Sequence, residues 1–366
     1  RPEAIKLAPV VLALRARPEA RVVLCATGQH RELLDSVLTV FGLTADANLD
    51  VMRPAQHLTD LLARMLAGLR GLVHDTKPDA LLVQGDTTTA MAGALAGFAD
   101  HVPVGHVEAG LRTYDNTAPF PEEANRRVVG VLAARHFAPT AMARDNLLAE
   151  RVPAETISVT GNTVVDALRW VRDRLTPEDR PRFLDSTRRL VLLTAHRRES
   201  FGSPLRRAFR AVRQLADNFA DVQVVYPVHP NPEVRAAVNA ELTGHPRITL
   251  VDPTDYRTTV WLMNHAHLIL TDSGGIQEEA PSLGRPVLVL RDVSERPEGV
   301  QAGVVRLVGT HPDRIISDAT RLLTDPVAYL QAGRATDIYG DGQAARRIAD
   351  LVLDGRTDLP EFAPIA

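Results

Sequence analysis

The sequence predicts an α/β protein with two doubly wound, Rossmann-like domains. Three observations support this fold class. Short apolar, β-branched runs alternate with longer amphipathic segments, which is typical of a parallel sheet with helices on both faces. The alternation restarts after a polar stretch near the middle of the chain, and 366 residues exceed what one hydrophobic core usually organises. Ligands bind such sheets beyond the carboxyl ends of the strands, so we expect functional residues there.

The first domain is expected to span residues 1–163. The sequence starts without a methionine, in what looks like the first turn of a helix, and we expect that a strand preceding Arg1 is missing from this chain. Strands are expected at residues 21–26, 80–84, 102–107 and 156–159, and helices at residues 29–41, 58–75, 87–99, 122–134 and 141–150.

The second domain is expected to span residues 164–340. A helix at residues 164–175 connects the domains, and the polar stretch 176–189, which contains two prolines, is expected to be a linker or surface loop. Strands are expected at residues 190–194, 222–228, 248–251, 267–271, 286–290 and 304–307.

Composition excludes several classes of function. The 42 basic and 45 acidic side chains nearly balance, which argues against a nucleic-acid or membrane-surface partner. The single cysteine, Cys25, excludes an internal disulfide framework and is expected to be a buried strand residue. No apolar stretch approaches the roughly 20 residues of a membrane span and no signal peptide opens the chain, so we expect a cytoplasmic protein. Neither a nicotinamide motif nor a closed set of metal ligands is present, and we expect no cofactor and no metal.

A glycine-containing turn follows the apolar run that ends at Thr271. Ser273, Gly274 and Gly275 have little bulk, so a diphosphate could approach the backbone N–H groups at the start of the next helix. Glu279, one turn further on, is placed to hold sugar hydroxyls. The same turn would also suit a helix that only packs tightly on its strand, and alone it is weak support for a ligand site.

Carboxylates follow two predicted strands of the first domain. Asp86 and Glu108 come directly after these strands, and Glu122 and Glu123 stand at the start of a predicted helix. Each has an ordinary alternative role, as a helix cap, an arginine partner or a favourable charge at a helix N-terminus. Carboxylates that converge in one partly dry site would raise one another's pKa values and provide an acid and a base at neutral pH.

Histidines follow two predicted strands of the second domain. His196 is flanked by Arg197 and Arg198, a combination that suits an anionic ligand, although a histidine at a strand end often only caps or packs. His229 occupies a similar position, but three prolines surround it and would also make a rigid structural turn.

A series of motifs runs from Arg1 to about Arg347: RPEAIK, GDTTT, GHVEAGLRT, PEEANR, TGNTVVDAL, AHRRES, YPVHPNP, TDSGGIQEEAPSLG, SERPEG and YGDGQA. In this order they resemble the non-hydrolysing UDP-N-acetylglucosamine 2-epimerases. The resemblance implies reversible conversion of UDP-GlcNAc to UDP-ManNAc, by elimination and re-addition of UDP through a glycal, in a homodimer. It also implies a fold like that of the two-domain (GT-B type) glycosyltransferases, with an interdomain cleft and a C-terminal helix and tail (341–366) that return to the N-terminal domain.

The resemblance assigns roles to individual residues. The catalytic set matches Asp86, Glu108, Glu122 and His196, and the substrate contacts match Arg1, Lys6, Ser273, Gly274, Gly275, Glu279 and Arg296. Gln29 and His229 match a site for an activating second UDP-GlcNAc, and Thr259 replaces an aromatic residue that many members carry near uracil. The alternatives are a hydrolysing 2-epimerase that releases ManNAc and UDP, a glycosyltransferase of the same architecture, and a non-catalytic nucleotide-sugar binder.

Overall fold

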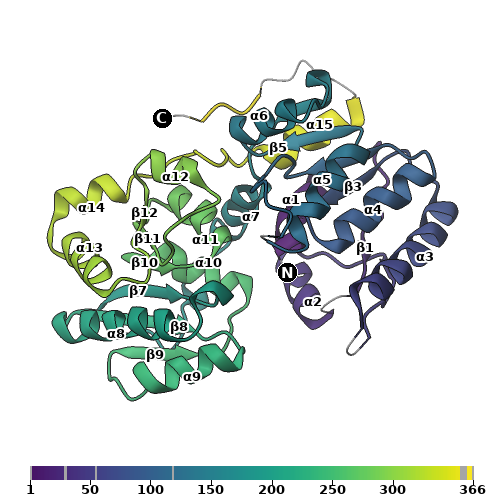
Figure 1. Ribbon diagram of the computed structural model, residues 1–366. Helices are drawn as coiled ribbons and strands as arrows, with labels where there is room; N and C mark the ends of the chain where they lie inside the picture. The colour runs from purple at the N-terminus through teal and green to yellow at the C-terminus, as the bar shows by residue number, and fades with distance from the viewer. Residues whose placement is uncertain (1, 29–30, 54–55, 118, 355–360, 365–366) are drawn as a thin grey trace. The chain divides into compact units, whose positions relative to one another are not determined.

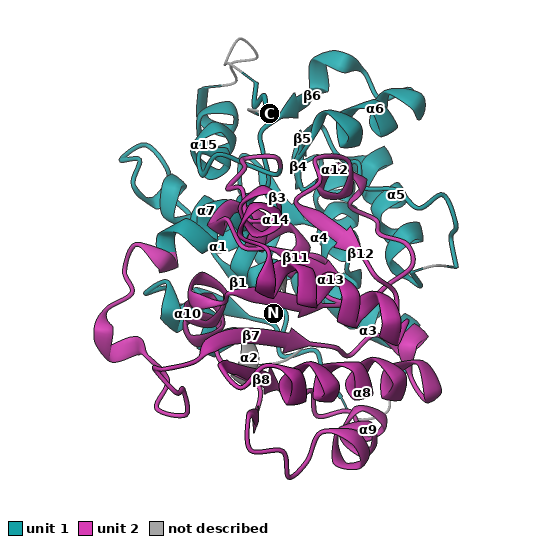
Figure 2. Ribbon diagram, turned by 90° about the vertical axis from the view of Figure 1, so that its left-hand side faces the viewer, with its two compact units in different colours: residues 1–170, 339–364 teal, residues 171–338, 365–366 magenta. Residues whose placement is uncertain are grey.

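The computed structural model describes residues 2–28, 31–53, 56–117, 119–354 and 361–364 (Figure 1). The chain divides into two compact units, coloured separately in Figure 2. Unit 1 comprises residues 1–170 and 339–364, and unit 2 comprises residues 171–338 and 365–366. Both units are parallel-sheet α/β structures, which confirms the predicted fold class. In the described ranges no helix has both the length and the apolar character needed to cross a membrane.

Unit 2 contains a six-stranded parallel sheet, formed by β7 (Arg189–Thr194), β8 (Val222–Pro227), β9 (Ile248–Val251), β10 (Leu268–Thr271), β11 (Val287–Val289) and β12 (Val305–Leu307). The strand order is β12-β11-β10-β7-β8-β9, so the first strand in sequence lies in the middle. The order reverses between β7 and β10, which makes their carboxyl ends the topological switch point where ligands of such folds bind. All six strands overlap the strands expected from the sequence.

Several helices of unit 2 bury apolar residues in one core with this sheet. In α8 (Ser203–Asn218), Leu205, Phe209 and Val212 recur at helical spacing and pack in one core with Val191 of β7. The remaining helices are α9 (Pro232–Glu241), α10 (Tyr256–His265), α11 (Gly274–Glu279), α12 (Pro297–Gln301), α13 (Pro312–Thr324) and α14 (Pro326–Ala332). A 3-10 helix, η4 (Ala280–Leu283), continues α11.

Unit 1 contains a four-stranded parallel sheet in the order β3 (Leu81–Gln84), β4 (Val104–Val107), β5 (Arg135–Ala138) and β6 (Ile157–Val159), and a separate parallel pair, β1 (Cys25–Ala26) with β2 (Ala47–Asn48). Its helices are α1 (Pro2–Arg15), α2 (Arg31–Val40), α3 (Leu58–Thr76), α4 (Thr88–Ala99), α5 (Glu122–Leu132), α6 (Ala141–Ala149), α7 (Thr163–Arg172, whose last two residues fall in unit 2) and α15 (Ala344–Asp354). α15 packs on α1 through Ile348 and Ala349 against Val10 and Leu14 (Figure 1).

One strand prediction for unit 1 is too long, and two strands, β2 and β5, were not expected. The strand expected over residues 21–26 is reduced to Cys25–Ala26, and residues 21–24 line a cavity of about 1030 Å³ that is bounded by α1, α3 and β3. The strand β5 was not expected at all, because Arg135 and His136 interrupt its apolar pattern. Cys25 is half-buried, and burial raises the pKa of its thiol to about 11, so the thiol is protonated and unreactive near neutral pH.

Candidate active site

Asp86 and Glu108 follow adjacent strands of unit 1. Gln84, the last residue of β3, pairs with Val107, the last residue of β4, so the two carboxylates leave the sheet at the same edge. Gly85, between Gln84 and Asp86, has a positive φ of 68°, which a glycine adopts at low cost and which turns the chain away from the sheet. Both residues therefore lie at the carboxyl edge, where ligands of such sheets bind.

The Glu108 carboxylate is buried and held by three donors. Oε1 accepts hydrogen bonds from the ammonium of Lys6, on α1, and from Nδ2 of Asn162 at 3.1 Å, and Oε2 accepts from Nε2 of Gln84. The backbone of Glu108 has φ = 64°, a left-handed conformation that is uncommon for a residue with a side chain and that clusters at functional sites. The hydrogen bonds from Lys6, Gln84 and Asn162 fix the position of the carboxylate.

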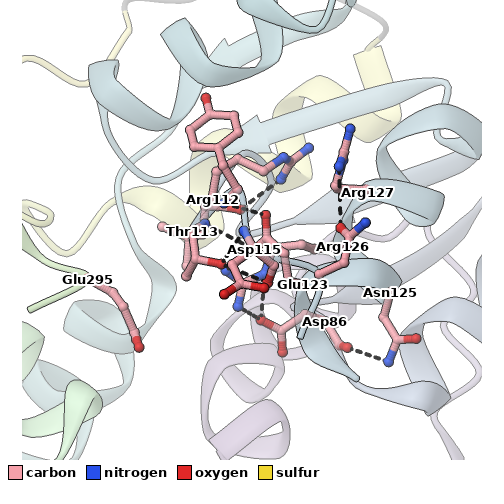
Figure 3. Close-up of polar contacts among 12 residues, drawn as sticks. Asp86, Arg112, Thr113, Asp115, Glu123, Asn125, Arg126, Arg127 and Glu295 are labelled. Carbon is pink, nitrogen blue, oxygen red and sulfur yellow. Dashed lines mark hydrogen bonds and ion pairs between the residues drawn. The ribbon is translucent and has the colours of Figure 1, made fainter. Parts of the chain in front are cut away.

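Asp86 is held by the start of α5, as Figure 3 shows. The Arg126 guanidinium donates from Nε and Nη2 to Oδ2 of Asp86, with the Nε distance 3.1 Å, and Nδ2 of Asn125 donates to the Asp86 carbonyl at 2.9 Å. Sequence reasoning did not assign Asn125 and Arg126 a role. Their spacing of three and four residues from Glu122 was the available signal, because such residues share one helix face.

Glu122 and Glu123 are adjacent in sequence but have different environments. Glu123 is fully buried and its two carboxylate oxygens accept from the backbone N–H groups of Thr113 and Tyr114, each at 3.0 Å, and from Arg126 at 3.1 Å (Figure 3). Glu122 is partly exposed, and its carboxylate makes no hydrogen bond or ion pair with another described residue. Glu123 is thus committed to holding the loop, whereas Glu122 has its carboxylate available to a ligand.

The switch point of unit 2 carries His196, two residues beyond β7. Its imidazole stacks on that of His229, with ring centroids 5.1 Å apart and planes at 10°. Burial and then the neighbouring His196 lower the pKa of His229, which favours the neutral form of the His229 imidazole. Asp272, directly after β10, lies beside His196. The sequence analysis assigned it no role, although its position immediately before the Ser-Gly-Gly turn could have indicated one.

Ser273, Gly274 and Gly275 begin α11 beside these residues. A Cβ atom at Gly274 would lie 3.0 Å from the guanidinium carbon of Arg296, so glycine permits this arginine to approach the turn. Arg296 is itself oriented by Glu278, at 2.8 Å, and by Glu295, at 2.7 Å. Glu279 accepts a hydrogen bond from the Tyr256 hydroxyl at 2.7 Å, which fixes its carboxylate.

Some residues expected at the site lie outside the described residues. Arg1 and Gln29 belong to this group, so the contact expected from Arg1 and the activator site expected from Gln29 and His229 stay predictions. Thr259 is described, and its hydroxyl donates to the Asp255 carbonyl at 2.7 Å. Within the described ranges no three histidine, cysteine, aspartate or glutamate side chains are grouped as metal ligands.

The two clusters offer complementary chemistry. The unit 1 cluster supplies carboxylates at the end of a sheet, with neighbouring cations that set their charge, and such groups act as general acids and bases. The unit 2 cluster supplies backbone N–H groups, Arg296 and His196, which suit an anionic group that gains charge during a reaction.

Comparisons with known proteins agree on one family. A profile of the UDP-N-acetylglucosamine 2-epimerase family matches residues 12–353. The chain is 55% identical to the UDP-N-acetylglucosamine 2-epimerase of Yersinia pestis and 52% identical to that of Escherichia coli K12, in each case over 98% of both chains. The crystal structure of the Neisseria meningitidis UDP-GlcNAc 2-epimerase bound to UDP-GlcNAc matches with a TM-score of 0.91 and 43% identity, over 97% of both chains.

Proposed function

The chain belongs to the UDP-N-acetylglucosamine 2-epimerase family, and we propose that it interconverts UDP-GlcNAc and UDP-ManNAc by a non-hydrolysing route. The observation that carries the proposal is the carboxylate cluster of unit 1. Asp86 and Glu108 leave adjacent strands at one edge of the sheet, and Glu122 stays available while Glu123 is committed to the loop. The structure of a relative with UDP-GlcNAc bound, at 43% identity, supports the nucleotide sugar as ligand.

The chemistry explains why such a cluster is needed. The hydrogen on carbon 2 of the sugar has no adjacent carbonyl to acidify it, so its direct removal is difficult. In the proposed route a base takes the carbon-2 proton, the electron pair of that C–H bond forms the double bond between carbons 1 and 2, and UDP leaves with the pair of the C1–O bond. The product is a glycal. Return of a proton to the opposite face of carbon 2, with addition of UDP to carbon 1, inverts the centre.

The residues divide into two groups by role. Asp86, Glu108 and Glu122 are the proposed acids and bases for the two faces of the sugar, and Lys6 and Arg126 compensate the charge of Glu108 and Asp86. The Ser273–Gly275 turn, Arg296 and His196 are proposed to hold the diphosphate, so that UDP stays bound after the bond to the sugar breaks. Glu279, oriented by Tyr256, is proposed to bind the ribose hydroxyls.

The products formed from UDP-GlcNAc alone test this function against its rivals. The purified protein is incubated with UDP-GlcNAc and no acceptor, and the products are separated by chromatography. The proposal predicts a mixture of UDP-GlcNAc and UDP-ManNAc. Free ManNAc with UDP would identify a hydrolysing 2-epimerase instead. Absence of turnover until an acceptor is supplied would identify a glycosyltransferase, and absence of turnover under all conditions would leave a nucleotide-sugar binder.

A further inference from the structure

Asp272 is a buried carboxylate at the switch point of unit 2. Its side chain is only 1% exposed, and Oδ2 accepts hydrogen bonds from the backbone N–H groups of His196, at 2.6 Å, and Arg197, at 2.7 Å. These two bonds connect the turn after β10 to the turn after β7. The carboxylate therefore fixes the backbone from which the His196 imidazole extends.

The second oxygen of Asp272 faces the His196 imidazole. Oδ1 lies 3.5 Å from Nδ1 of His196 and has no hydrogen-bond partner among the residues that the structure describes. The Tyr226 hydroxyl donates to the Ala195 carbonyl and not to Asp272. A buried carboxylate oxygen without a donor is unfavourable, so Oδ1 favours a proton on the facing Nδ1 of His196.

We propose that Asp272 is the positioning residue of His196: it keeps Nδ1 protonated, so that any further proton is taken up at Nε2, from which it can be donated to the departing diphosphate. The stacked ring of His229, whose own Nδ1 accepts from the Asn231 N–H at 3.2 Å, fixes the plane of the His196 imidazole from one side. Two restraints thus define the orientation of His196, one on its edge and one on its face. The catalytic consequence rests on the proposed function, whereas the pairing itself rests on the geometry alone.

The variant Asp272→Asn separates positioning from structure. Its amide oxygen can still accept from the His196 and Arg197 N–H groups, but its NH₂ group would face Nδ1 and favour the wrong tautomer. We expect kcat to fall by about 10²–10⁴-fold, as when the carboxylate of a catalytic histidine is replaced by an amide, with KM changed by less than about threefold. Thermal stability is expected to change little.

A double-mutant cycle tests whether Asp272 acts through His196. In a His196→Gln background, adding Asp272→Asn is expected to lower kcat by no more than about threefold, because the imidazole that it positions is gone. Losses that multiply would overturn the proposal. The matched control is Asp217→Asn, since Asp217 pairs with the buried His245 at 2.9 Å at the other end of α8, and it is expected to leave kcat unchanged.

A spectroscopic readout keeps the pairing testable without turnover. Long-range ¹H–¹⁵N spectra of histidine-labelled protein at alkaline pH, with His196 assigned through His196→Gln, report which ring nitrogen carries the proton. We expect Nδ1–H in the wild type and Nε2–H in Asp272→Asn. An Nε2–H tautomer in the wild type would overturn the proposal, even if the variant failed to fold. An inactive wild type with the expected tautomers would refute the proposed function and leave the pairing intact.

Discussion

Lys6 and Glu108 form a buried ion pair although 102 positions separate them in the sequence. The pair joins the first helix of unit 1 to the end of β4, and Glu108 takes a left-handed backbone conformation there. Gln84 and Asn162 donate to the same carboxylate. The environment of the Glu108 carboxylate is therefore built from four separate segments of the chain, and its geometry depends on each of them.

Removal of the Lys6 charge is expected to destabilise the protein until Glu108 is neutralised as well. Lys6→Met leaves a buried carboxylate without its cation, which should lower the free energy of unfolding by about 3 kcal/mol. Adding Glu108→Gln should restore part of this loss, because it removes the uncompensated charge, although its single amide oxygen cannot replace both carboxylate oxygens that Gln84 and Asn162 use. Activity should stay low in both variants. Urea unfolding and an epimerase assay check the two parts, and an additive loss of stability in the double variant would contradict the account.

The neighbouring carboxylates of α5 are expected to respond in opposite ways to the same substitution. Glu122→Gln should lower kcat by about 10²–10⁴-fold with unchanged stability, because its carboxylate is available to the substrate. Glu123→Gln should lower the free energy of unfolding by about 2 kcal/mol, because one amide cannot replace all the acceptors used by Thr113, Tyr114 and Arg126. Each variant is the control for the other. Equal effects of both variants on kcat and stability would contradict this division of roles.

Most of the fold could be predicted from the sequence because the strands of unit 2 are short apolar runs between polar segments. The predictions failed where a strand lacks that pattern or lacks neighbours. In β5, the polar residues Arg135 and His136 interrupt the apolar pattern that identifies a strand, and the strand forms because it pairs with β4 and β6. Residues 21–24 have the right composition, but no strand ladder forms there: the Leu24 carbonyl accepts from the N–H groups of Asp46 and Ala47, and its N–H donates to the Asp46 side chain. Composition alone cannot show whether a partner strand is beside a segment.

The positions of the candidate site could be predicted, but most of its contacts could not. Asp86, Glu108 and His196 were found because they follow strands, and parallel strands end at one edge. Their partners could not be predicted in this way. Lys6 and Arg126 come from segments far away in the sequence, and Asp272 directly precedes the Ser-Gly-Gly turn instead of belonging to it. The residue pattern alone did not distinguish Glu122 from Glu123, and only the family resemblance assigned Glu122 a role. The three-dimensional structure reveals that Glu123 accepts from the loop N–H groups.

Alanine substitutions at the turn before α11 should separate ligand binding from packing. Gly275→Ala meets no atom closer than Glu279 Oε2, at 3.8 Å, so the free protein should tolerate it, whereas UDP affinity should fall by about tenfold or more. Gly274→Ala should weaken UDP binding similarly and also lower the melting temperature, because its Cβ would press on Arg296. Calorimetric titration with UDP and thermal unfolding check both. Unchanged UDP affinity in Gly275→Ala would show that the diphosphate binds elsewhere.

Asp166 is expected to make the stability of unit 1 depend on pH. Burial raises the pKa of this carboxyl to about 7, although the N–H groups of Ala344 and Ala345 at the start of α15 oppose the shift. Since the folded state binds the proton more tightly, Asp166 contributes stability below its unfolded pKa of about 4, and this contribution is lost as the pH rises through 7. The loss has an upper limit of about 4 kcal/mol.

The variant Asp166→Asn isolates this effect from other titrations, including that of Asp341, whose pKa is lowered chiefly by Arg347. An amide resembles the protonated acid, so variant and wild type should have similar urea midpoints at pH 4.5. At pH 8 the variant should be the more stable protein. Parallel stability curves over this range would show that burial does not perturb Asp166.

Solvent deuterium at carbon 2 of the product tests the central claim most directly. The wild-type protein is incubated with UDP-GlcNAc in heavy water, and UDP-ManNAc is isolated and examined by NMR and mass spectrometry. Elimination and re-addition of UDP, with proton return from acids that exchange with solvent, predict one deuterium at carbon 2 of every UDP-ManNAc molecule. UDP-ManNAc formed in heavy water with hydrogen still at carbon 2 would contradict the account.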